Sequence, residues 1–568
     1  MHFSFCEKGK GTRVKPEDLY NKERGCGFIT ENNMPVSGLG NHFVIPAYYK
    51  DVETVKPEAG EQGVFIDQKK GCERLEASKD RLIPLMFAAD VPEYGNYKVK
   101  VEICAKGEVL IFAGSRRLVF RKTFAEKTVV SHSFDLNVSP IIPRGQTAPG
   151  DRRTVFITVL GEDVSLSETE SEKSNVPTLF ICGDSTVTDQ PADVPYAPGT
   201  SYSGWGQMMQ DHMSGVAVSN HAHSGLTTES FRSEGHYAIV EEMLKKGDYA
   251  MFQFAHNDQK LPHLKAAEGY RERLVQYIAE VRAAGAFPLL VTPLARNTWK
   301  PDGGGYNDLL KEYAEECFKI GEEYKVPVID LHGFSMNEVL RDGLDSSKRF
   351  YFPKDYTHTN DHGAYKMARF IAGELEKLTG DYKTLAEASK PDEAEWNIDE
   401  IPVVPEIPEK FKMTEKKEEP VLFAELERPD DRAKRCEALD MVIKAAKFFP
   451  TNVFNDIYDD IVGHEWYAGT VQCAFQNGLI PKDMIRDKRF RPEEDITLQD
   501  LICFAVKACG SRRSLPAPKT TAYEGTCDEY AIEYMKLGVA LGLVGENKDP
   551  KATLTRREAA DICLAMRI

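Results

Sequence analysis

The sequence predicts a multidomain protein with a central three-layer α/β/α domain, an antiparallel β-sandwich before it and a small all-α region after it. A chain of 568 residues is too long for one hydrophobic core, and about 150 residues per domain suggests three or four units. Residues 1–160 alternate apolar and polar side chains with period two, whereas residues 175–385 alternate strand-like and helix-like segments. We therefore place the all-α region at 431–568, after a linker at 386–430.

The N-terminal region is divided into short alternating stretches by glycine and proline, which is typical of an antiparallel sandwich. The polar stretch that follows, 161–175, is rich in serine and glutamate and is predicted to be a linker. A second change in composition, to Glu, Lys and Pro, begins near Leu385 and predicts the linker before the C-terminal region. The N-terminal strand candidates are Tyr97–Ile103, Glu108–Phe112, Arg117–Phe120 and Val155–Val159.

The central region has the pattern of a parallel sheet covered on both faces, because apolar strand-like runs alternate with amphipathic helical segments. The predicted strands are Thr178–Cys182, Val216–Ser219, Ala250–Phe254, Pro288–Thr292 and Val326–Asp330. The predicted helices are Val240–Lys245, Gly269–Ala284, Asn307–Tyr324 and Gly363–Leu378.

A candidate nucleophile and base lie at loop positions of this central region. Active-site residues of parallel α/β sheets lie where the strands end, at the carboxyl edge of the sheet. The first predicted strand is followed at once by Asp184 and Ser185, and serine is a candidate nucleophile. Far downstream, His358 follows Asp355 by three residues, a spacing that lets the carboxylate reach one imidazole nitrogen. We expect His358 to act as the base for Ser185, and Asp355 to orient the imidazole.

Donors for an oxyanion are expected from two intermediate turns, 220–225 and 255–258, each of which follows a predicted strand. The candidates are the backbone N–H groups of Ser185 and Gly225 and the side-chain amide of Asn257. Loss of one such donor typically raises the reaction barrier by about 3–4 kcal/mol.

Four sequence blocks in this order resemble the SGNH (GDSL-like) hydrolase family, over about residues 175–380. Within the family the sequence is most similar to rhamnogalacturonan acetylesterases, which carry histidine where many other members have glycine in the third block. The blocks are Gly183-Asp184-Ser185-Thr186, the Asn220 to Gly225 turn, His256-Asn257-Asp258 and Asp355-Tyr356-Thr357-His358, with Gly204-Trp205-Gly206 as a further similarity. The resemblance implies Ser185, His358 and Asp355 as the catalytic triad, Ser185, Gly225 and Asn257 as the oxyanion hole, and no metal or organic cofactor.

Three residues near these turns are candidates for contact with the substrate: His256, Arg296 and Trp299. An arginine in the loop after the fourth strand matches the carboxylate of an acidic sugar such as galacturonate. A solvated loop is the alternative for this segment. His221 and His223 lie beside Gly225 in the turn 220–225, called the oxyanion turn below. No third ligand lies near them in the sequence, so a metal site is not expected.

The N-terminal region resembles the galactose-binding-like sandwich that precedes some bacterial rhamnogalacturonan acetylesterases, which implies a carbohydrate-binding role. An equally supported alternative is a lid or packing partner for the catalytic domain. The resemblance lies in Tyr20–Phe28, Gly95–Tyr97 and Ser115–Leu118.

The C-terminal region resembles S-layer homology repeats, which implies cell-wall polysaccharide as a possible partner. Thr555-Arg556-Arg557-Glu558 is similar to the signature that such repeats use for pyruvylated polysaccharide, whereas the middle repeat, Thr497–Asp500, lacks the arginine. A structural or dimerising role is the alternative. The other similar segments are Phe454–Ile457, Trp466–Ala468, Gly478–Ile480 and Phe490–Pro492.

Composition limits the classes of partner. A formal charge of −17 and a pI near 5.4 argue against nucleic acid and anionic membrane surfaces, and no stretch approaches the roughly 20 apolar residues of a membrane helix. The 12 cysteines form no metal-binding spacing. The N-terminus lacks the apolar core of a signal peptide, so we expect a cytoplasmic protein, or a secreted or surface protein if a signal peptide has been removed.

Taken together, these features predict a serine carbohydrate O-acetylesterase acting on plant cell-wall oligosaccharides, most of all rhamnogalacturonan or pectin. Acetylated xylan or mannan is the nearest alternative, because fold and triad do not identify the alcohol. A cell-wall polysaccharide-binding protein with a vestigial hydrolase domain is a rival from another class. A lipase or thioesterase is a third possibility, disfavoured by the absence of a long apolar segment suited to a lid.

Overall fold

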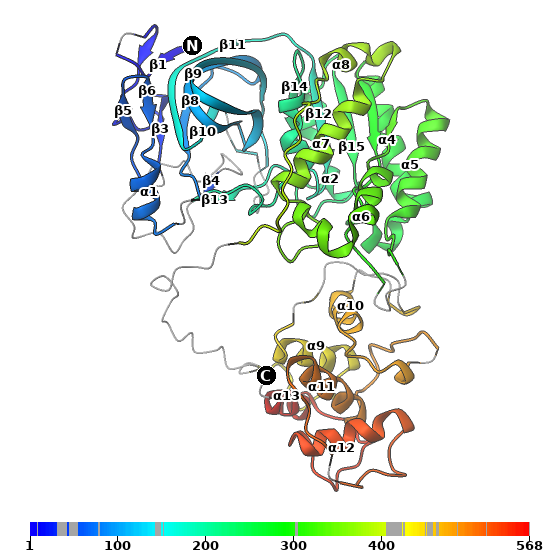
Figure 1. The fold of residues 1–568 in the computed structure, drawn as a ribbon. Coiled ribbons are helices and arrows are strands. Elements are labelled where there is room, and N and C mark those ends of the chain that lie inside the picture. Colours follow the sequence, from blue (N-terminus) through cyan, green and yellow to red (C-terminus); the bar gives the residue numbers. More distant parts are fainter. Residues whose placement is uncertain are drawn as a thin grey trace. The chain divides into compact units, whose positions relative to one another are not determined.

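A computed structural model describes the chain except residues 8, 31–42, 45–54, 78–79, 143–148, 151–152, 301–304, 405–422, 424–425, 449, 451–457, 462–464, 486, 519 and 567–568. The chain forms two compact units. The first comprises Met1–Asp258 and Ala266–Lys412, and the second includes Met413–Ile568. The first unit contains both an N-terminal β-sheet and an α/β domain (Figure 1).

In the described part of the N-terminal region, hydrogen bonds join ten strands into one sheet with the main order β2-β1-β11-β8-β10-β7-β3. Strand β9 pairs with β8, and β6 links β5 to β11. The strands are β1 (His2–Ser4), β2 (Thr12–Arg13), β3 (Cys26–Ile29), β5 (Glu58–Gly60), β6 (Gly63–Phe65), β7 (Leu85–Asp90), β8 (Gly95–Ala113), β9 (Arg117–Val138), β10 (Thr154–Leu160) and β11 (Asp163–Lys173). Helix α1 (Gln68–Arg74) follows β6, and β4 (Phe43–Val44) pairs with β13 (Ala192–Asp193).

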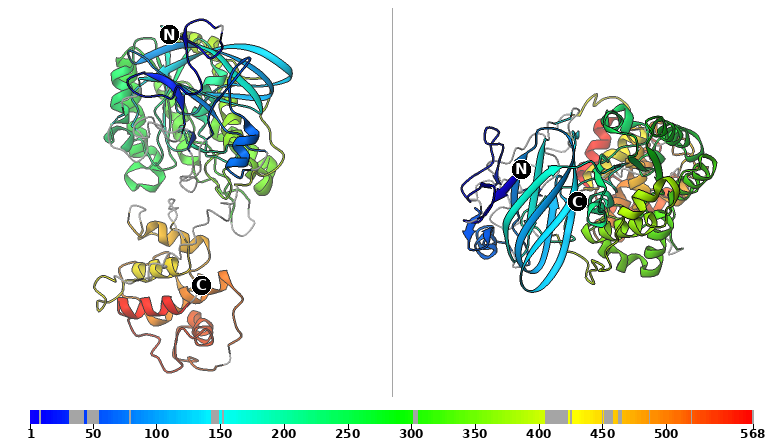
Figure 2. Two further views of the ribbon diagram at one scale, coloured as in Figure 1. Left: turned by 90° about the vertical axis from the view of Figure 1, so that its left-hand side faces the viewer. Right: turned by 90° about the horizontal axis from the view of Figure 1, so that it is seen from above.

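Strands β8 and β9 form a long antiparallel hairpin, and β8 pairs with β11 along one stretch and with β10 along another. A register shift lies between Ala105 and Gly107. Before the shift β8 pairs with β11, and after it residues Leu110–Ala113 pair with β10. The hairpin therefore passes from one group of strands to the other, and Figure 2 shows its strands curving beside the α/β elements. The finer expectation of a galactose-binding-like sandwich stays a prediction.

The prediction of a linker at 161–175 is wrong, because β11 occupies this segment and pairs with β8 and β1. Besides the apolar Val164 and Leu166, its buried positions carry serine and threonine. Ser165 and Ser167 both donate hydrogen bonds to the Gln62 carbonyl oxygen, at 3.1 and 2.7 Å. Because the buried hydroxyl groups of β11 are hydrogen-bonded, the strand can bury polar side chains. Its sequence therefore lacks the alternation of apolar and polar residues that predicts a strand.

The α/β domain has a five-stranded, entirely parallel sheet in the order β14-β12-β15-β16-β17. All five predicted strands are present, with ends that differ from the predicted ends by at most two residues. Their bounds are β12 (Thr178–Gly183), β14 (Ala217–Asn220), β15 (Tyr249–Gln253), β16 (Phe287–Val291) and β17 (Val328–Ile329). The α-helices are α2 (Ser230–Ser233), α3 (His236–Met243), α4 (Arg271–Ala283), α5 (Lys311–Tyr324), α6 (Leu331–Ser347), α7 (Asp361–Leu375) and α8 (Lys383–Ala388), with a 3₁₀ segment η2 (Trp205–His212).

Helices cover both faces of this sheet. Successive side chains of a strand point to opposite faces, so Leu179 and Ile181 of β12 join the core that contains α7, whereas Phe180 and Cys182 join the core that contains α4 and α5. Figure 1 shows α7 and the pair α4 and α5 on opposite sides of the strands. The predicted parallel sheet between helical layers is confirmed.

The beginning of the predicted linker at 386–430 packs on the α/β domain. Trp396 is buried, its carbonyl oxygen accepts a 3.1 Å hydrogen bond from His362 Nδ1, and its ring meets Tyr365 edge-on. Most of the remaining segment lies outside the described residues.

The second unit is helical, with α9 (Arg435–Ala445), α10 (Ala468–Gln476), α11 (Leu498–Arg512), α12 (Ile532–Ala540) and α13 (Arg556–Ala565). The two predicted repeat starts, at Thr497 and Thr555, are the N-caps of α11 and α13. Arg556 Nη1 of α13 lies 2.6 Å from Glu437 Oε1 of α9. The segment Phe454–Ile457 lies outside the described residues. The S-layer-homology assignment stays a prediction, whereas the helical nature of this part is confirmed. Among the described residues, no helix has the length and apolar character needed to cross a bilayer.

Candidate active site

Ser185, His358 and Asp355 form a continuous chain of hydrogen-bonding side chains. Ser185 Oγ lies 2.8 Å from His358 Nε2, and His358 Nδ1 lies 2.8 Å from Asp355 Oδ2. Asp355 Oδ1 also accepts hydrogen bonds from the backbone N–H groups of Thr357 at 2.7 Å and His358 at 2.9 Å. With Nδ1–H directed at the carboxylate, Nε2 is the nitrogen that can accept the Ser185 proton.

The Asp355 carboxyl group is held in its ionised form. Its burial alone would raise the pKa. The hydrogen bonds and charge of His358, together with the two backbone N–H groups, outweigh the burial and lower the pKa below its ordinary value. A negative charge therefore faces the imidazole on the side away from Ser185.

The parallel topology brings the predicted turns to one edge of the sheet. Strand β12 lies between β14 and β15, so the chain reverses its direction of travel across the sheet next to β12. Such a reversal opens a crevice at the carboxyl ends of the strands. Ser185 follows β12 and Asn257 follows β15. The turn after β14 lies against both, because His223 N–H donates to the Gly183 carbonyl oxygen at 3.1 Å and Asn257 Nδ2 donates to that of Leu226 at 2.9 Å.

Gly225 and Asn257 are arranged as donors at this edge. The Asn257 bond to Leu226 orients the amide toward the turn that contains Gly225. An amide nitrogen carries two hydrogens, so Nδ2 can serve Leu226 and a substrate oxygen together. Gly225 is exposed and has φ of +86°, a backbone region that favours glycine.

Asp258 connects the two turns, a role that the sequence did not indicate. Its Oδ1 accepts hydrogen bonds from Thr228 N–H at 2.8 Å and Thr228 Oγ1 at 2.6 Å, and its Oδ2 accepts one from Ala255 N–H at 3.1 Å. Burial raises the pKa of Asp258 to about 7. The side chain thus fixes the Ala255–Asn257 turn, where Ala255 has φ of +130°, against the turn after β14.

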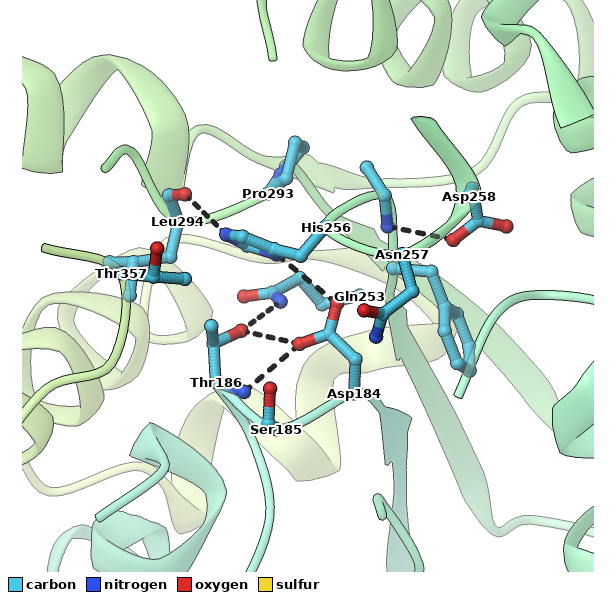
Figure 3. A network of polar contacts seen from close by, with 12 residues as sticks. Asp184, Ser185, Thr186, Gln253, His256, Asn257, Asp258, Pro293, Leu294 and Thr357 are labelled. Carbon is cyan, nitrogen blue, oxygen red and sulfur yellow. Dashed lines mark hydrogen bonds and ion pairs between the residues drawn. The ribbon is translucent and has the colours of Figure 1, made fainter. Parts of the chain in front are cut away.

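Directly beside Ser185, Asp184 and His256 form a buried polar pair (Figure 3). Asp184 is fully buried; its Oδ1 accepts hydrogen bonds from Thr186 N–H at 3.0 Å and Thr186 Oγ1 at 2.8 Å. Its Oδ2 lies 3.1 Å from His256 Nδ1, while His256 Nε2 lies 2.9 Å from the Leu294 carbonyl oxygen. Burial alone would raise the pKa of Asp184, but His256 and the Thr186 donors lower it.

The hydrogen bonds of His256 have a chemical consequence. Both acceptors that flank the ring, a carbonyl oxygen and a carboxylate oxygen, require a hydrogen on the nitrogen that they face. With Asp184 ionised, both contacts are satisfied when the ring carries a proton on each nitrogen. Burial lowers the pKa of His256 and so opposes this second proton, whereas the Asp184 carboxylate favours it. The two side chains form a buried hydrogen-bonded pair next to the nucleophile.

Two of the three candidate substrate residues are interior residues. His256 is only 2% exposed and has partners on both ring nitrogens, so it does not present a free group to a substrate. Arg296 is 5% exposed; its Nη1 donates to Thr357 Oγ1 at 2.7 Å and its Nη2 to the His256 carbonyl oxygen at 3.2 Å. The side chain of Arg296 therefore does not lie in a solvated loop, whereas a contact between Arg296 and a substrate stays a prediction.

Trp299 is partly exposed, and its Nε1 donates to Asn297 Oδ1 at 2.9 Å. Its ring meets Tyr306 edge-on at 5.9 Å between centroids. A role for Trp299 in substrate binding stays a prediction.

Several supporting residues were not singled out from the sequence. Gln190 Nε2 lies 3.4 Å from the Ser185 carbonyl oxygen and 3.2 Å from Ser224 Oγ. The Tyr202 ring meets His358 edge-on at 5.6 Å and stacks on Phe352 at 3.7 Å. The available signal was weak, because glutamine and tyrosine in loops are common and neither lies in a recognisable motif.

The histidines near the oxyanion turn have partners within the protein. His221 Nε2 lies 2.9 Å from Ser219 Oγ, and His223 Nδ1 lies 3.1 Å from the Ser224 carbonyl oxygen. Within the described ranges, no group of three or more His, Cys, Asp or Glu side chains is arranged to hold a metal ion.

Comparison with known proteins places this geometry in a family. The model of the GDSL-like lipase/acylhydrolase family matches residues 181–365. The rhamnogalacturonan acetylesterase RhgT of Bacillus subtilis (strain 168) is 34% identical over 217 residues, which cover 35% of this chain and 90% of RhgT. The probable rhamnogalacturonan acetylesterase YesY of the same organism is 30% identical over 209 residues, covering 35% and 93%.

A longer match includes more than this domain. The uncharacterized esterase YxiM, also of Bacillus subtilis (strain 168), is 25% identical over 373 residues, which cover 64% of this chain and 86% of YxiM. The motif order, the parallel sheet and the near-complete coverage of RhgT and YesY lead to one conclusion: the chain belongs to the GDSL-like lipase/acylhydrolase family of SGNH esterases.

Proposed function

We propose that the protein is a serine carbohydrate O-acetylesterase in which Ser185 is the nucleophile, His358 the general base and Asp355 the group that orients the imidazole. The observation that carries the proposal is the unbroken chain from Ser185 Oγ through His358 to Asp355, with 2.8 Å at each step. Nucleophile, base and orienting carboxylate within hydrogen-bond reach are what nucleophilic ester hydrolysis requires.

In the acylation half of the reaction, Ser185 Oγ attacks the acetyl carbonyl carbon while His358 Nε2 takes the hydroxyl proton. Negative charge then develops on the carbonyl oxygen, and the N–H groups of Ser185 and Gly225 and the Asn257 amide stabilise it. The bond from the carbonyl carbon to the sugar oxygen breaks. His358 gives its proton to that oxygen, so a free sugar hydroxyl leaves and the acetyl group stays on Ser185.

In the second half, water replaces the sugar as the attacking group. His358 Nε2 takes a proton from the water as its oxygen bonds to the acetyl carbon. The ester bond to Ser185 Oγ breaks, the serine regains its proton from His358, and acetate leaves. The ionised Asp355 favours the imidazolium in both halves.

For the substrate, we propose an acetylated pectic oligosaccharide such as rhamnogalacturonan. This proposal is supported by the relatives. RhgT and an Emericella nidulans protein, 26% identical over 216 residues, are named rhamnogalacturonan acetylesterases, and YesY is named a probable one. The fold itself does not choose the alcohol, so xylan and mannan are outcomes to be tested.

The test is acetate release by the full chain from acetylated rhamnogalacturonan, xylan and mannan oligosaccharides, compared with Ser185→Ala and with Ser346→Ala, a matched change of an exposed serine. We expect release to be fastest from rhamnogalacturonan, to fall by about 10⁴-fold or more in Ser185→Ala and to be unchanged in Ser346→Ala. Preference for xylan or mannan would replace the substrate, and full activity in Ser185→Ala would remove the nucleophile.

A further inference from the structure

The turn of the β8–β9 hairpin places an arginine of the N-terminal sheet inside the α/β domain. Arg116 follows β8 by three residues and precedes β9, and its side chain is fully buried. Its φ of +59° is a left-handed conformation that costs a bulky residue energy and is uncommon outside glycine, asparagine and aspartate. A buried arginine in a strained turn is held in place by the groups that it contacts.

The guanidinium group of Arg116 binds two separate loops and one helix of the α/β domain. Nε donates to the Gln190 carbonyl oxygen at 2.8 Å, and Nη2 donates to the Tyr202 carbonyl oxygen at 2.7 Å and to Ser203 Oγ at 2.8 Å. Nη1 forms a 2.8 Å ion pair with Asp361 Oδ1, at the start of α7, and both side chains are fully buried. The planar fork is thus occupied in three directions, as a lysine could not achieve.

The first loop leads to the nucleophile and the oxyanion turn. Arg116 fixes the main chain of Gln190, whose Nε2 lies 3.4 Å from the Ser185 carbonyl oxygen and 3.2 Å from Ser224 Oγ. Ser224 immediately precedes Gly225. The Gln190 side chain therefore contacts both Ser185, the proposed nucleophile, and the turn that contains Gly225.

The second loop leads to the base. Ser203 N–H donates to the Thr359 carbonyl oxygen at 3.0 Å, and Thr359 Oγ1 donates to the Ser203 carbonyl oxygen at 2.7 Å. Thr359 is the residue after His358. The Tyr202 ring also meets the His358 ring edge-on. The loop that Arg116 holds is therefore paired with the segment that carries the imidazole.

We propose that Arg116 is a positioning residue for the esterase reaction, through which the N-terminal sheet sets the distance between Ser185, the oxyanion turn and His358. The proposal rests on the proposed function. It assigns the N-terminal sheet a part in catalysis, in addition to any sugar that the sheet binds. It also explains why a bulky residue occupies the left-handed position of the hairpin turn.

The test compares Arg116→Lys with Arg121→Met in the full chain. Arg116→Lys keeps a positive charge beside Asp361 but loses the fork to Gln190 and Tyr202. Arg121 also joins the N-terminal sheet to the α/β domain, with Nη2 donating to the Ala394 carbonyl oxygen at 3.0 Å and the guanidinium lying over Tyr365 and Trp396. Its contacts avoid the loops that Arg116 binds, so it is the matched interface control.

A third variant covers the case in which Arg116→Lys folds poorly. The double variant Arg116→Asn with Asp361→Asn removes both charges, and asparagine accepts the left-handed turn readily. It leaves no unpaired buried charge while it still releases the Gln190 and Tyr202 carbonyl oxygens.

The first readout is hydrogen–deuterium exchange of the folded chain, which does not depend on turnover. We expect faster exchange at the amides of Gln190 and Ser203 in both Arg116 variants, and wild-type exchange there in Arg121→Met. The second readout is hydrolysis of p-nitrophenyl acetate: kcat should fall about 100-fold in the Arg116 variants, as expected for misplaced reacting groups, with little change in KM. Arg121→Met should keep the wild-type kcat.

Unchanged exchange in the Arg116 variants, or a wild-type kcat in them, overturns the proposal, as does an equal loss of kcat in Arg121→Met. If the wild-type chain shows no Ser185-dependent hydrolysis, the proposed function fails, and the exchange readout alone then decides whether Arg116 holds the two loops.

Discussion

At the scale of single residues, the site depends on carboxylates whose charge is held by specific neighbours. Asp355 and Asp184 are both lowered in pKa by a histidine and by nearby N–H or O–H donors, in spite of their burial. They differ in their relation to the chemistry: Asp355 orients the imidazole that contacts Ser185, whereas Asp184 is buried beside Ser185 and contacts His256. Substitution at the two pairs should therefore have different effects.

Replacement of His256 by alanine should strongly destabilise the first unit. The variant leaves the Asp184 carboxylate fully buried without its imidazole partner, and removal of one partner of a buried pair typically costs about 3–5 kcal/mol in the free energy of unfolding. Urea unfolding gives the value, and the double variant with Asp184→Asn, which removes the charge, should recover part of it. A loss below about 1 kcal/mol would show that the buried Asp184 carboxylate does not depend on His256.

Asp355→Asn should destabilise the protein in a pH-dependent way. The pKa of Asp355 is lower in the folded state than its ordinary value of about 4, so the unfolded chain binds the proton more tightly. The stabilising contribution is present above that ordinary value and is lost as the pH falls through the folded-state pKa. Urea unfolding of wild type and variant at pH 7 and pH 4 should give the larger difference at pH 7; an equal or larger difference at pH 4 contradicts the assignment.

The residues that the sequence predicted and those that it missed differ in how they act. Ser185, His358 and Asp355 were predicted from four sequence blocks in a fixed order and from the three-residue spacing of Asp355 and His358. The structure has the contacts between them. His256 and Arg296 were predicted to face a substrate, because a sequence does not reveal that both are buried. Their contacts depend on loops that meet only in the folded chain.

At the scale of elements, close approach between loops decides which residues are tolerated. Gly204 precedes η2 and has an ordinary φ of −84°, so its backbone does not require glycine. A Cβ atom there would lie 2.2 Å from the Val187 carbonyl carbon and 2.4 Å from the Thr188 nitrogen. Glycine is required because the loop after Ser185 passes directly against it.

Gly204→Ala should therefore destabilise the protein by about 1–3 kcal/mol or more through overpacking against main chain. The control is Gly373→Ala in α7, where a Cβ would meet nothing within 4 Å and helix propensity favours alanine by about 1 kcal/mol. Thermal unfolding of both variants gives the comparison. Equal stability of the two would show that the Gly204 contact relaxes freely.

The elements themselves were predicted where burial and apolar character coincide. The strands of the parallel sheet are apolar on both faces, so their runs are evident, and their helices have clear periodicity. Strand β11 was taken for a linker because most of its buried residues are serine and threonine. Helix α6 was missed because Gly343, with φ of +74°, interrupts its pattern. In both, tertiary hydrogen bonds and packing supply what local composition does not.

At the scale of the whole molecule, the N-terminal sheet and the α/β domain form one folding unit. Apolar residues from both belong to one core, which includes Phe112 of β8, Met208 of η2 and Tyr196. Arg117, the first residue of β9, adds a 2.8 Å ion pair with buried Asp189. The second unit has a separate core.

We expect the first unit, Met1–Asp258 with Ala266–Lys412, to unfold in a single transition and the second unit to unfold in another. Hydrogen exchange measured peptide by peptide along a urea gradient should give β8, β9 and β12 the same midpoint. A separate, earlier midpoint for β8 and β9 would contradict a shared core.

The most direct test of whether His358 activates Ser185 is covalent labelling of the full chain with a fluorophosphonate ester, followed by peptide mapping. We expect one adduct, on Ser185, formed much more slowly in His358→Ala and absent in Ser185→Ala. An adduct on another serine, or labelling of Ser185 at the wild-type rate in His358→Ala, would contradict the claim that His358 activates Ser185.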